Sequence, residues 1–87
     1  MGQFSKTGTI TWIGVIRSKP FRRGFDEVRS GKPIDYDAFD DDINAQWHYE
    51  RGRAFGIVWD GVLMKGIHVL PEAVEACQQA YEAGAFI

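Results

Sequence analysis

The chain has 87 residues, of which 45% are hydrophobic, 14% aromatic and 25% charged, and its net charge is −2. This length allows one compact domain, residues 1–87, and the balance of residues excludes a disordered or collagen-like chain. No apolar run approaches the roughly 18 residues that a membrane span needs, and residues 1–6 lack the apolar stretch of a signal peptide. We therefore expect a cytoplasmic protein. Cys77 is the only cysteine, which is consistent with a reducing compartment.

The two halves of the chain carry opposite charge. Residues 1–34 hold seven Lys/Arg against two Asp/Glu, a net of +5, and residues 35–87 hold three against ten, a net of −7. Such an asymmetry indicates either a charged partner or two halves that pack against each other. We favour the second explanation.

The pattern predicts a small α+β domain with a two-stranded antiparallel sheet and about three helices. Residues 7–17 are rich in β-branched and aromatic side chains, with Ile10, Trp12 and Ile16 in alternate register, which predicts the first strand. The short apolar segment 62–70 is its expected partner strand.

Residues 20–31 predict a short amphipathic helix, followed by a polar loop over residues 32–42. Three apolar residues of the helix recur at i, i+4 and i+7, namely Phe21, Phe25 and Val28. Its expected N-cap, first-turn proline and terminal glycine are Ser18, Pro20 and Gly31.

A second helix is predicted to begin near Asp40 to Asp42, whose carboxylates can cap it, and to end at Trp59 or Asp60. Its core-facing arc is expected to hold Ile43, Trp47, Ala54, Ile57 and Val58. The opposite face carries Ala45, Tyr49, Gly52, Gly56 and Trp59. The two glycines on that face indicate a close backbone approach or an earlier helix end. In the alternative, residues 55–59 are a strand and Asp60-Gly61 is a hairpin turn, but we favour the helix.

A last helix is predicted to begin at Pro71 and to stop at Gly84. Val74, Cys77 and Tyr81 line its apolar face, where a buried and inert thiol is the usual finding.

Five aspartates crowd the loop before the second long helix: Asp35, Asp37, Asp40, Asp41 and Asp42. Their spacing does not fit a calcium-binding EF-hand, because the fifth position counted from Asp35 is Phe39 and the twelfth is Gln46. Two interpretations remain. One is helix capping with a solvated acidic loop, and the other is contact with a basic partner surface or mimicry of nucleic-acid phosphates.

No residue pattern indicates catalysis. Neither His48 nor His68 has a Ser, Cys or carboxylate at a spacing that would make it a general base, and the glycines do not form a phosphate-binding motif. Residues 47–56 interleave aromatics with two arginines, which is the chemistry of RNA contact. The alternative is an internal pair of Glu50 and Arg51 among buried aromatics.

Four segments of the chain carry a resemblance to a known family: Arg23-Gly24-Phe25, Ser30-Gly31-Lys32-Pro33, Gln46-Trp47 and Arg51-Gly52-Arg53-Ala54-Phe55. Together they resemble the two-helix pattern of ribosome modulation factor and related short bacterial and phage reading frames, over about residues 20–56. The resemblance implies a non-enzymatic ribosome or RNA binder that uses Arg22, Arg23, Lys32, Arg51 and Arg53. Ribosome modulation factor is basic, whereas the loop here is acidic.

We expect a non-enzymatic interaction module, of the kind that a phage uses to bind and inhibit a host protein machine through an acidic and aromatic surface. The residues expected to contact the partner are Asp35, Asp37, Asp40, Asp41, Tyr49, Gly52, Arg53 and Gly56. RNA or ribosome binding is the alternative. Neither hypothesis involves a membrane, a metal or a cofactor.

Overall fold

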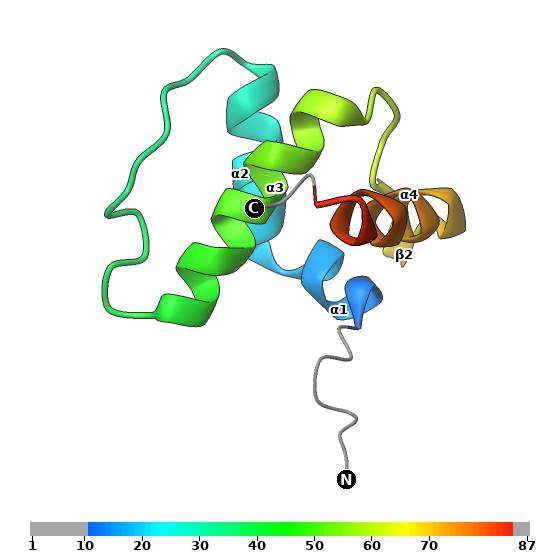
Figure 1. Cartoon of the computed structure of the whole chain (residues 1–87), viewed down its shortest axis with the longest axis horizontal. Helices are drawn as coiled ribbons and strands as arrows, with labels where there is room; N and C mark the ends of the chain where they lie inside the picture. Colours follow the sequence, from blue (N-terminus) through cyan, green and yellow to red (C-terminus); the bar gives the residue numbers. More distant parts are fainter. Residues whose placement is uncertain (1–10, 85–87) are drawn as a thin grey trace, which may run out of the picture.

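The structure is a computed structural model that describes residues 11–84 of the chain. This part contains four helices and one two-stranded antiparallel sheet, so the protein is a small α+β domain, as predicted. The elements in chain order are α1 (Trp12–Arg17), α2 (Lys19–Arg29), α3 (Ile43–Val58), β1 (Met64–Lys65), β2 (His68–Val69) and α4 (Pro71–Glu82). Helices α2 and α3 cross at the centre of the molecule, with α1 and α4 packed around them (Figure 1).

The strand predicted over residues 7–17 is wrong in its described part, which forms helix α1. Ile10 lies outside the described residues. Trp12, Val15 and Ile16 are buried, and their spacing of three and four places them on one face of a helix. Trp12 and Ile16 are four residues apart, and this spacing fits one face of a helix as well as one face of a strand.

Aromatic packing of Trp12 explains why α1 is helical despite its β-branched residues. The ring centroid of Trp12 lies 6.2 Å from that of Trp47 on α3 and 5.6 Å from that of Tyr81 on α4. Contacts of this kind between distant segments outweigh local β-propensity, which is a weak and context-dependent preference.

Residues 62–70 contain both strands of a hairpin. They do not form a single strand that pairs with the N-terminal segment. Strand β1 pairs with β2, with Lys65 opposite His68. Gly66 has a φ of +63° at the first of the two turn positions, where a type II′ hairpin turn requires glycine. The predicted sheet is present, but its expected first strand is wrong.

Local capping chemistry fixes the ends of α2 as the sequence predicts. The Ser18 side chain accepts a hydrogen bond from the Phe21 amide at 3.3 Å. At the other end Gly31 has a φ of +77°, and the Lys32 amide donates to the Glu27 carbonyl at 2.9 Å. This is the Schellman arrangement, which satisfies carbonyl groups at a helix C-terminus.

Helix α3 also begins where the sequence places it. The Asp42 side chain accepts a hydrogen bond from the Ala45 amide at 3.1 Å. The helix continues to Val58, so the favoured helix is confirmed over a strand at residues 55–59.

The face that α3 turns inward differs from the predicted one. Ile43, Ile57 and Val58 were expected in the core but are 85%, 73% and 59% exposed. Trp47 and Ala54 are half-buried and do pack against the core. The fully buried residues of α3 come mainly from the face expected to lie outside.

Glycines allow the backbones of α2 and α3 to touch. A Cβ atom on Gly24 would overlap the carbonyl oxygen of Tyr49, and one on Gly52 would overlap the carbonyl oxygen of Phe21. A Cβ atom on Gly56 would strike a side chain of α2. Only residues without a side chain permit this approach, so these glycines determine which face of α3 is buried.

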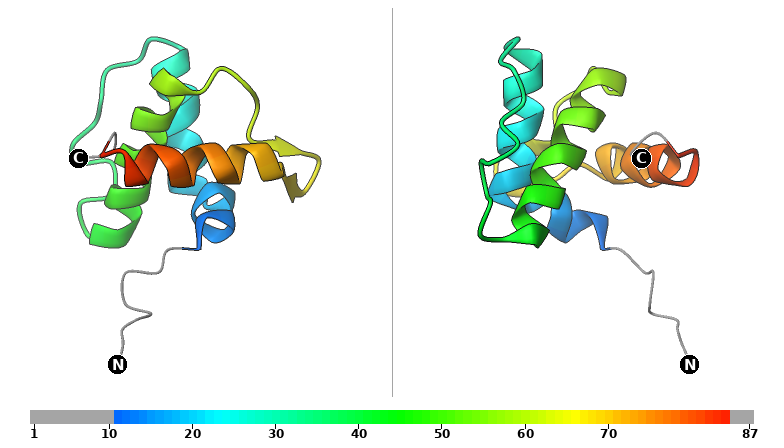
Figure 2. Two further views of the ribbon diagram at one scale, coloured as in Figure 1. Left: turned by 45° about the vertical axis from the view of Figure 1, so that its right-hand side comes forward. Right: turned by 60° about the vertical axis from the view of Figure 1, so that its left-hand side comes forward.

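The same contacts show that α2 and α3 run in the same direction. Gly52 faces Phe21, and Gly56 faces Phe25 one turn further along both helices. The 11 residues of α2 rise about 16 Å, and the chain must return over that distance before α3 begins. Residues 30–42 make this return as a long loop, on the side of the helix pair away from α4 (Figures 1 and 2).

Helix α4 begins at Pro71, and Gly84 has a φ of +81° just beyond its end, as expected. On its predicted apolar face Cys77 is buried, Val74 is half-buried and Tyr81 is 42% exposed. Burial raises the pKa of Cys77 to about 12, so the thiol stays protonated near neutral pH and is a poor nucleophile.

The glycine contact predicts opposite effects of alanine at two helical positions. Gly52→Ala should lower the free energy of unfolding by about 1–3 kcal/mol, because the added methyl group pushes the two backbones apart. Among the described residues, no atom lies within 4 Å of the position that a Cβ on Gly14 in α1 would take. Gly14→Ala, the matched control, should therefore raise stability by up to about 1 kcal/mol. Urea unfolding measures both, and a stabilised Gly52→Ala variant would contradict the packing.

Candidate functional site

The segment of residues 32–42, called the acidic loop below, is held against α2 and α3 by polar contacts of side chains on the two helices. Tyr49 of α3 is fully buried, and its hydroxyl donates a hydrogen bond of 2.6 Å to Oε1 of Glu27 on α2. The same hydroxyl oxygen accepts a bond of 3.0 Å from the Asp35 amide in the loop. One side-chain oxygen thus joins two helices and the loop.

Glu27 accepts bonds from two arginines as well as from Tyr49. Arg23 Nε lies 2.7 Å from Glu27 Oε2, and Arg53 Nη1 lies 3.5 Å from Glu27 Oε1. Arg53 also donates to the carbonyl oxygen of Lys32 at 2.8 Å, which fastens the start of the acidic loop. The side chains of Glu27 and Arg53 are only 14% and 13% exposed, so this pair is largely shielded from water.

These contacts shift the titration of Glu27 and Tyr49 in opposite directions. The hydrogen bond from Tyr49 and then that from Arg23 lower the pKa of Glu27 below its ordinary value of 4.5. Burial and then the bond to the Glu27 carboxylate raise the pKa of Tyr49 above 10.0. At neutral pH the pair is therefore a phenol that donates to an ionised carboxylate.

Gln46 clamps the middle of the acidic loop. Its Oε1 accepts from the Phe39 amide at 2.8 Å, and its Nε2 donates to the Asp35 carbonyl oxygen at 3.2 Å. Nε2 also lies 3.0 Å from Glu50 Oε2, one turn along α3. The backbone of the loop is thereby fixed at Asp35 by two partners and at Phe39 by one.

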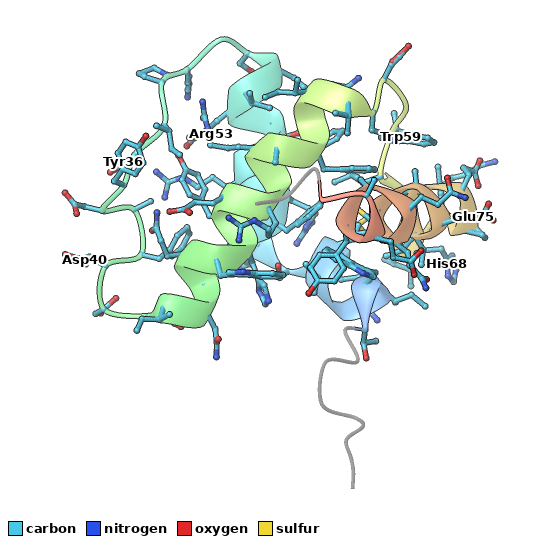
Figure 3. All side chains as sticks on the ribbon, in the orientation of Figure 1. Tyr36, Asp40, Arg53, Trp59, His68 and Glu75 are labelled. Atoms are coloured by element: carbon cyan, nitrogen blue, oxygen red, sulfur yellow. The ribbon has the colours of Figure 1, made fainter. Side chains whose placement is uncertain are left out.

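A groove of about 370 Å³ lies between the clamped loop and the first half of α3. From the loop it is lined by Tyr36, Phe39 and Asp40, and from α3 by Ile43, Gln46, Trp47 and Glu50. Its walls combine aromatic and apolar side chains with two carboxylates, and none of the described residues that line it is basic. Tyr36 and Asp40 lie at one edge of the molecule in Figure 3, across from His68 and Glu75.

The residues predicted to bind a partner fall into two groups. Asp35, Asp37, Asp40 and Asp41 are exposed on the acidic loop. Tyr49 and Gly52 are buried, and Arg53 and Gly56 are half-buried against α2, the loop or both. The second group lies mainly within the fold, and only Arg53 and Gly56 keep part of their surface exposed.

The five basic residues of the RNA hypothesis do not form one free face. Arg23 and Arg53 bind Glu27, and Arg51 lies over the ring of Trp47, with its Cζ 4.9 Å from the ring centroid. Arg22 and Lys32 are exposed. The expected pair of Glu50 and Arg51 is present at 3.7 Å, which supports the internal explanation for these charges.

Sequence analysis missed the role of Glu27 and the aromatic lining of the groove. Tyr36 and Phe39 stand among the aspartates of the loop. This mixture of aromatic and acidic residues could have indicated a surface that is both aromatic and negatively charged. Glu27 gave no such signal, because its partner Tyr49 lies 22 positions away along the chain.

Within residues 11–84 no group of three or more His, Cys, Asp or Glu side chains is placed to hold a metal ion. His48 is half-buried, and burial lowers its pKa below 6.5. No helix in this part of the chain has the length and apolar character to cross a membrane.

Comparisons of the chain with protein families, with curated proteins and with solved structures found no match.

The shifted pKa of Glu27 predicts a specific loss of stability in acid. A carboxyl group whose pKa is lower in the folded protein stabilises it fully above the pKa of the unfolded chain, and this contribution disappears as the pH falls through the folded pKa. Glu27→Gln should therefore lower stability at pH 7, by about 1–3 kcal/mol. It should also reduce the further loss between about pH 5 and pH 2.

Asp26→Asn is the matched control, because Asp26 neighbours Glu27 on α2 but is exposed. It should retain the pH dependence of the unaltered protein. Thermal or urea unfolding across that pH range measures both variants. A Glu27→Gln variant with the full acid sensitivity would show that the contacts of Glu27 do not stabilise the fold.

Proposed function

We propose that the protein is a non-enzymatic interaction module that binds a partner protein through the acidic loop and the adjoining start of α3. The observation that carries this proposal is the fixed presentation of Asp37, Asp40 and Asp41. All three are exposed, on a loop whose backbone is held by Tyr49 and Gln46.

Preorganisation makes such a loop suited to binding. A free loop loses conformational entropy when a partner orders it, whereas one that is already clamped loses less. The exposed carboxylates attract basic surfaces at long range and raise the rate of association. The groove beside them adds apolar area that a partner can bury.

We place this activity in the cytoplasm, and we propose a phage-type inhibitor that occupies the surface of a host protein machine. The single buried cysteine is compatible with reducing conditions. A protein of this size would act by covering a surface that another molecule needs.

The resemblance to ribosome modulation factor remains a proposal about the helix pair. Gly24 and Gly52, which belong to the resembling segments, form the contact between α2 and α3. If the two proteins have a common origin, the feature that they share would be the packing of the two helices. A common origin does not require a shared RNA surface, since Arg23 and Arg53 are engaged within this fold.

A capture experiment with tagged full-length protein in bacterial lysate, with and without nuclease, tests the proposal. The variant Asp37→Asn, Asp40→Asn, Asp41→Asn removes three negative charges from the loop. The variant Asp60→Asn, Glu72→Gln, Glu75→Gln removes three from exposed positions elsewhere and is the matched control. Capture should resist nuclease, fall several-fold in the loop variant and weaken with salt, while the control variant should retain it.

Two results would reject the proposal. Capture that disappears with nuclease would assign the protein to RNA binding. Equal capture by both triple variants would show that the acidic loop is not the contact surface.

A further inference from the structure

We propose that the groove beside the acidic loop binds an arginine side chain of the partner, with the guanidinium group between aromatic rings and carboxylates. This inference rests on the proposed function and names the chemistry of its contact. Tyr36, Phe39 and Trp47 supply the rings, and Asp40 and Glu50 supply the negative charge.

The charge of the groove selects a cation. Within residues 11–84 two carboxylates and no basic side chain line it, and the exposed Asp37 and Asp41 of the same loop add negative charge. Asp40 makes no hydrogen bond or ion pair with the other residues in the described range, so its carboxylate is available. Glu50 is less free, because it accepts from Gln46 and lies 3.7 Å from Arg51.

The rings select a guanidinium group within the class of cations. A planar guanidinium can stack on an aromatic face and bind a carboxylate with two parallel hydrogen bonds, which an ammonium group cannot do. The protein already uses this contact in its own fold. Arg51 Cζ lies 4.9 Å from the ring centroid of Trp47, and Arg23 Cζ lies 5.4 Å from that of Phe39. Neither arginine lines the groove, which is bordered by the same two rings.

The size of the groove is consistent with one inserted side chain. Its volume of about 370 Å³ is at the small end of the range of ligand sites. Tyr36 is 72% exposed and Ile43 is 85% exposed, so the entrance has apolar area for residues that flank the arginine. A folded partner surface would contact this rim while the arginine side chain lies in the groove.

The experiment is an NMR titration of the full chain with N-acetyl-arginine methylamide. The neutral isostere N-acetyl-citrulline methylamide and the cation N-acetyl-lysine methylamide serve as comparison probes. We expect saturable shifts of the Trp47 indole, the Gln46 side-chain amide and the Asp40 amide with the arginine probe. Dissociation constants should be several-fold weaker for the lysine probe, and weaker still for the citrulline probe.

Two variants locate the response in the groove. Tyr36→Ala and Asp40→Asn alter exposed residues, so the fold should be retained, and the same spectra verify that it is. Each should weaken the binding of the arginine probe several-fold. Glu75→Gln, at the opposite edge of the molecule, should leave the binding of that probe unchanged (Figure 3). Equal binding of arginine and citrulline, equal or tighter binding of lysine, or unaltered binding to both groove variants would overturn the inference.

The two proposals fail separately. If capture depends on the acidic loop but the arginine probe leaves the groove signals unmoved, only the arginine site is rejected. If the groove binds the probe but capture does not depend on the loop, only the proposed protein contact is rejected.

Discussion

The carbonyl oxygens of Phe21 and Tyr49 occupy the space that side chains on Gly52 and Gly24 would fill. This direct contact between the backbones of α2 and α3 brings Tyr49 of one helix within 2.6 Å of Glu27 on the other. Because the helices run in the same direction, the chain between them must travel back along their length. The acidic loop is that return path, and the buried hydroxyl of Tyr49 ties it down. The surface proposed to bind a partner is thus a consequence of how two glycine-bearing helices pack.

Sequence patterns predicted the features that depend on neighbouring residues. The N-cap bonds of Ser18 and Asp42, the helix-ending Gly31 and the extent of α3 follow from local hydrogen bonding and backbone freedom. The errors concern contacts between distant segments. Residues 12–17 have strand-like composition, but helix packing places Trp12, Val15 and Ile16 in the core. The positions of the apolar residues in α3 predicted the wrong buried face. A pattern of apolar residues takes no account of glycines, and glycines form the tightest contact here.

The part of the candidate site that depends on local chemistry could likewise be predicted from the sequence. Exposure of Asp37, Asp40 and Asp41 follows from charge alone, since isolated carboxylates are rarely buried. That the loop is clamped by Gln46 and Tyr49 depends on tertiary structure and has no local signature. One exposed ion pair joins the positive and negative halves of the chain, with Arg23 4.0 Å from Asp35. The other aspartates of the loop are exposed.

Amide hydrogen exchange at two loop positions tests most directly whether the buried tyrosine holds the acidic loop in place. The Asp35 amide donates to the Tyr49 hydroxyl and the Phe39 amide to Gln46, so both should be protected in the unaltered protein. In Tyr49→Phe the protection of Asp35 should fall several-fold, while amides in the middle of α2 keep theirs and show that the fold persists. An Asp35 amide that exchanges as freely as in an unfolded chain, or one indifferent to Tyr49→Phe, would contradict the proposed link between helix packing and the binding surface.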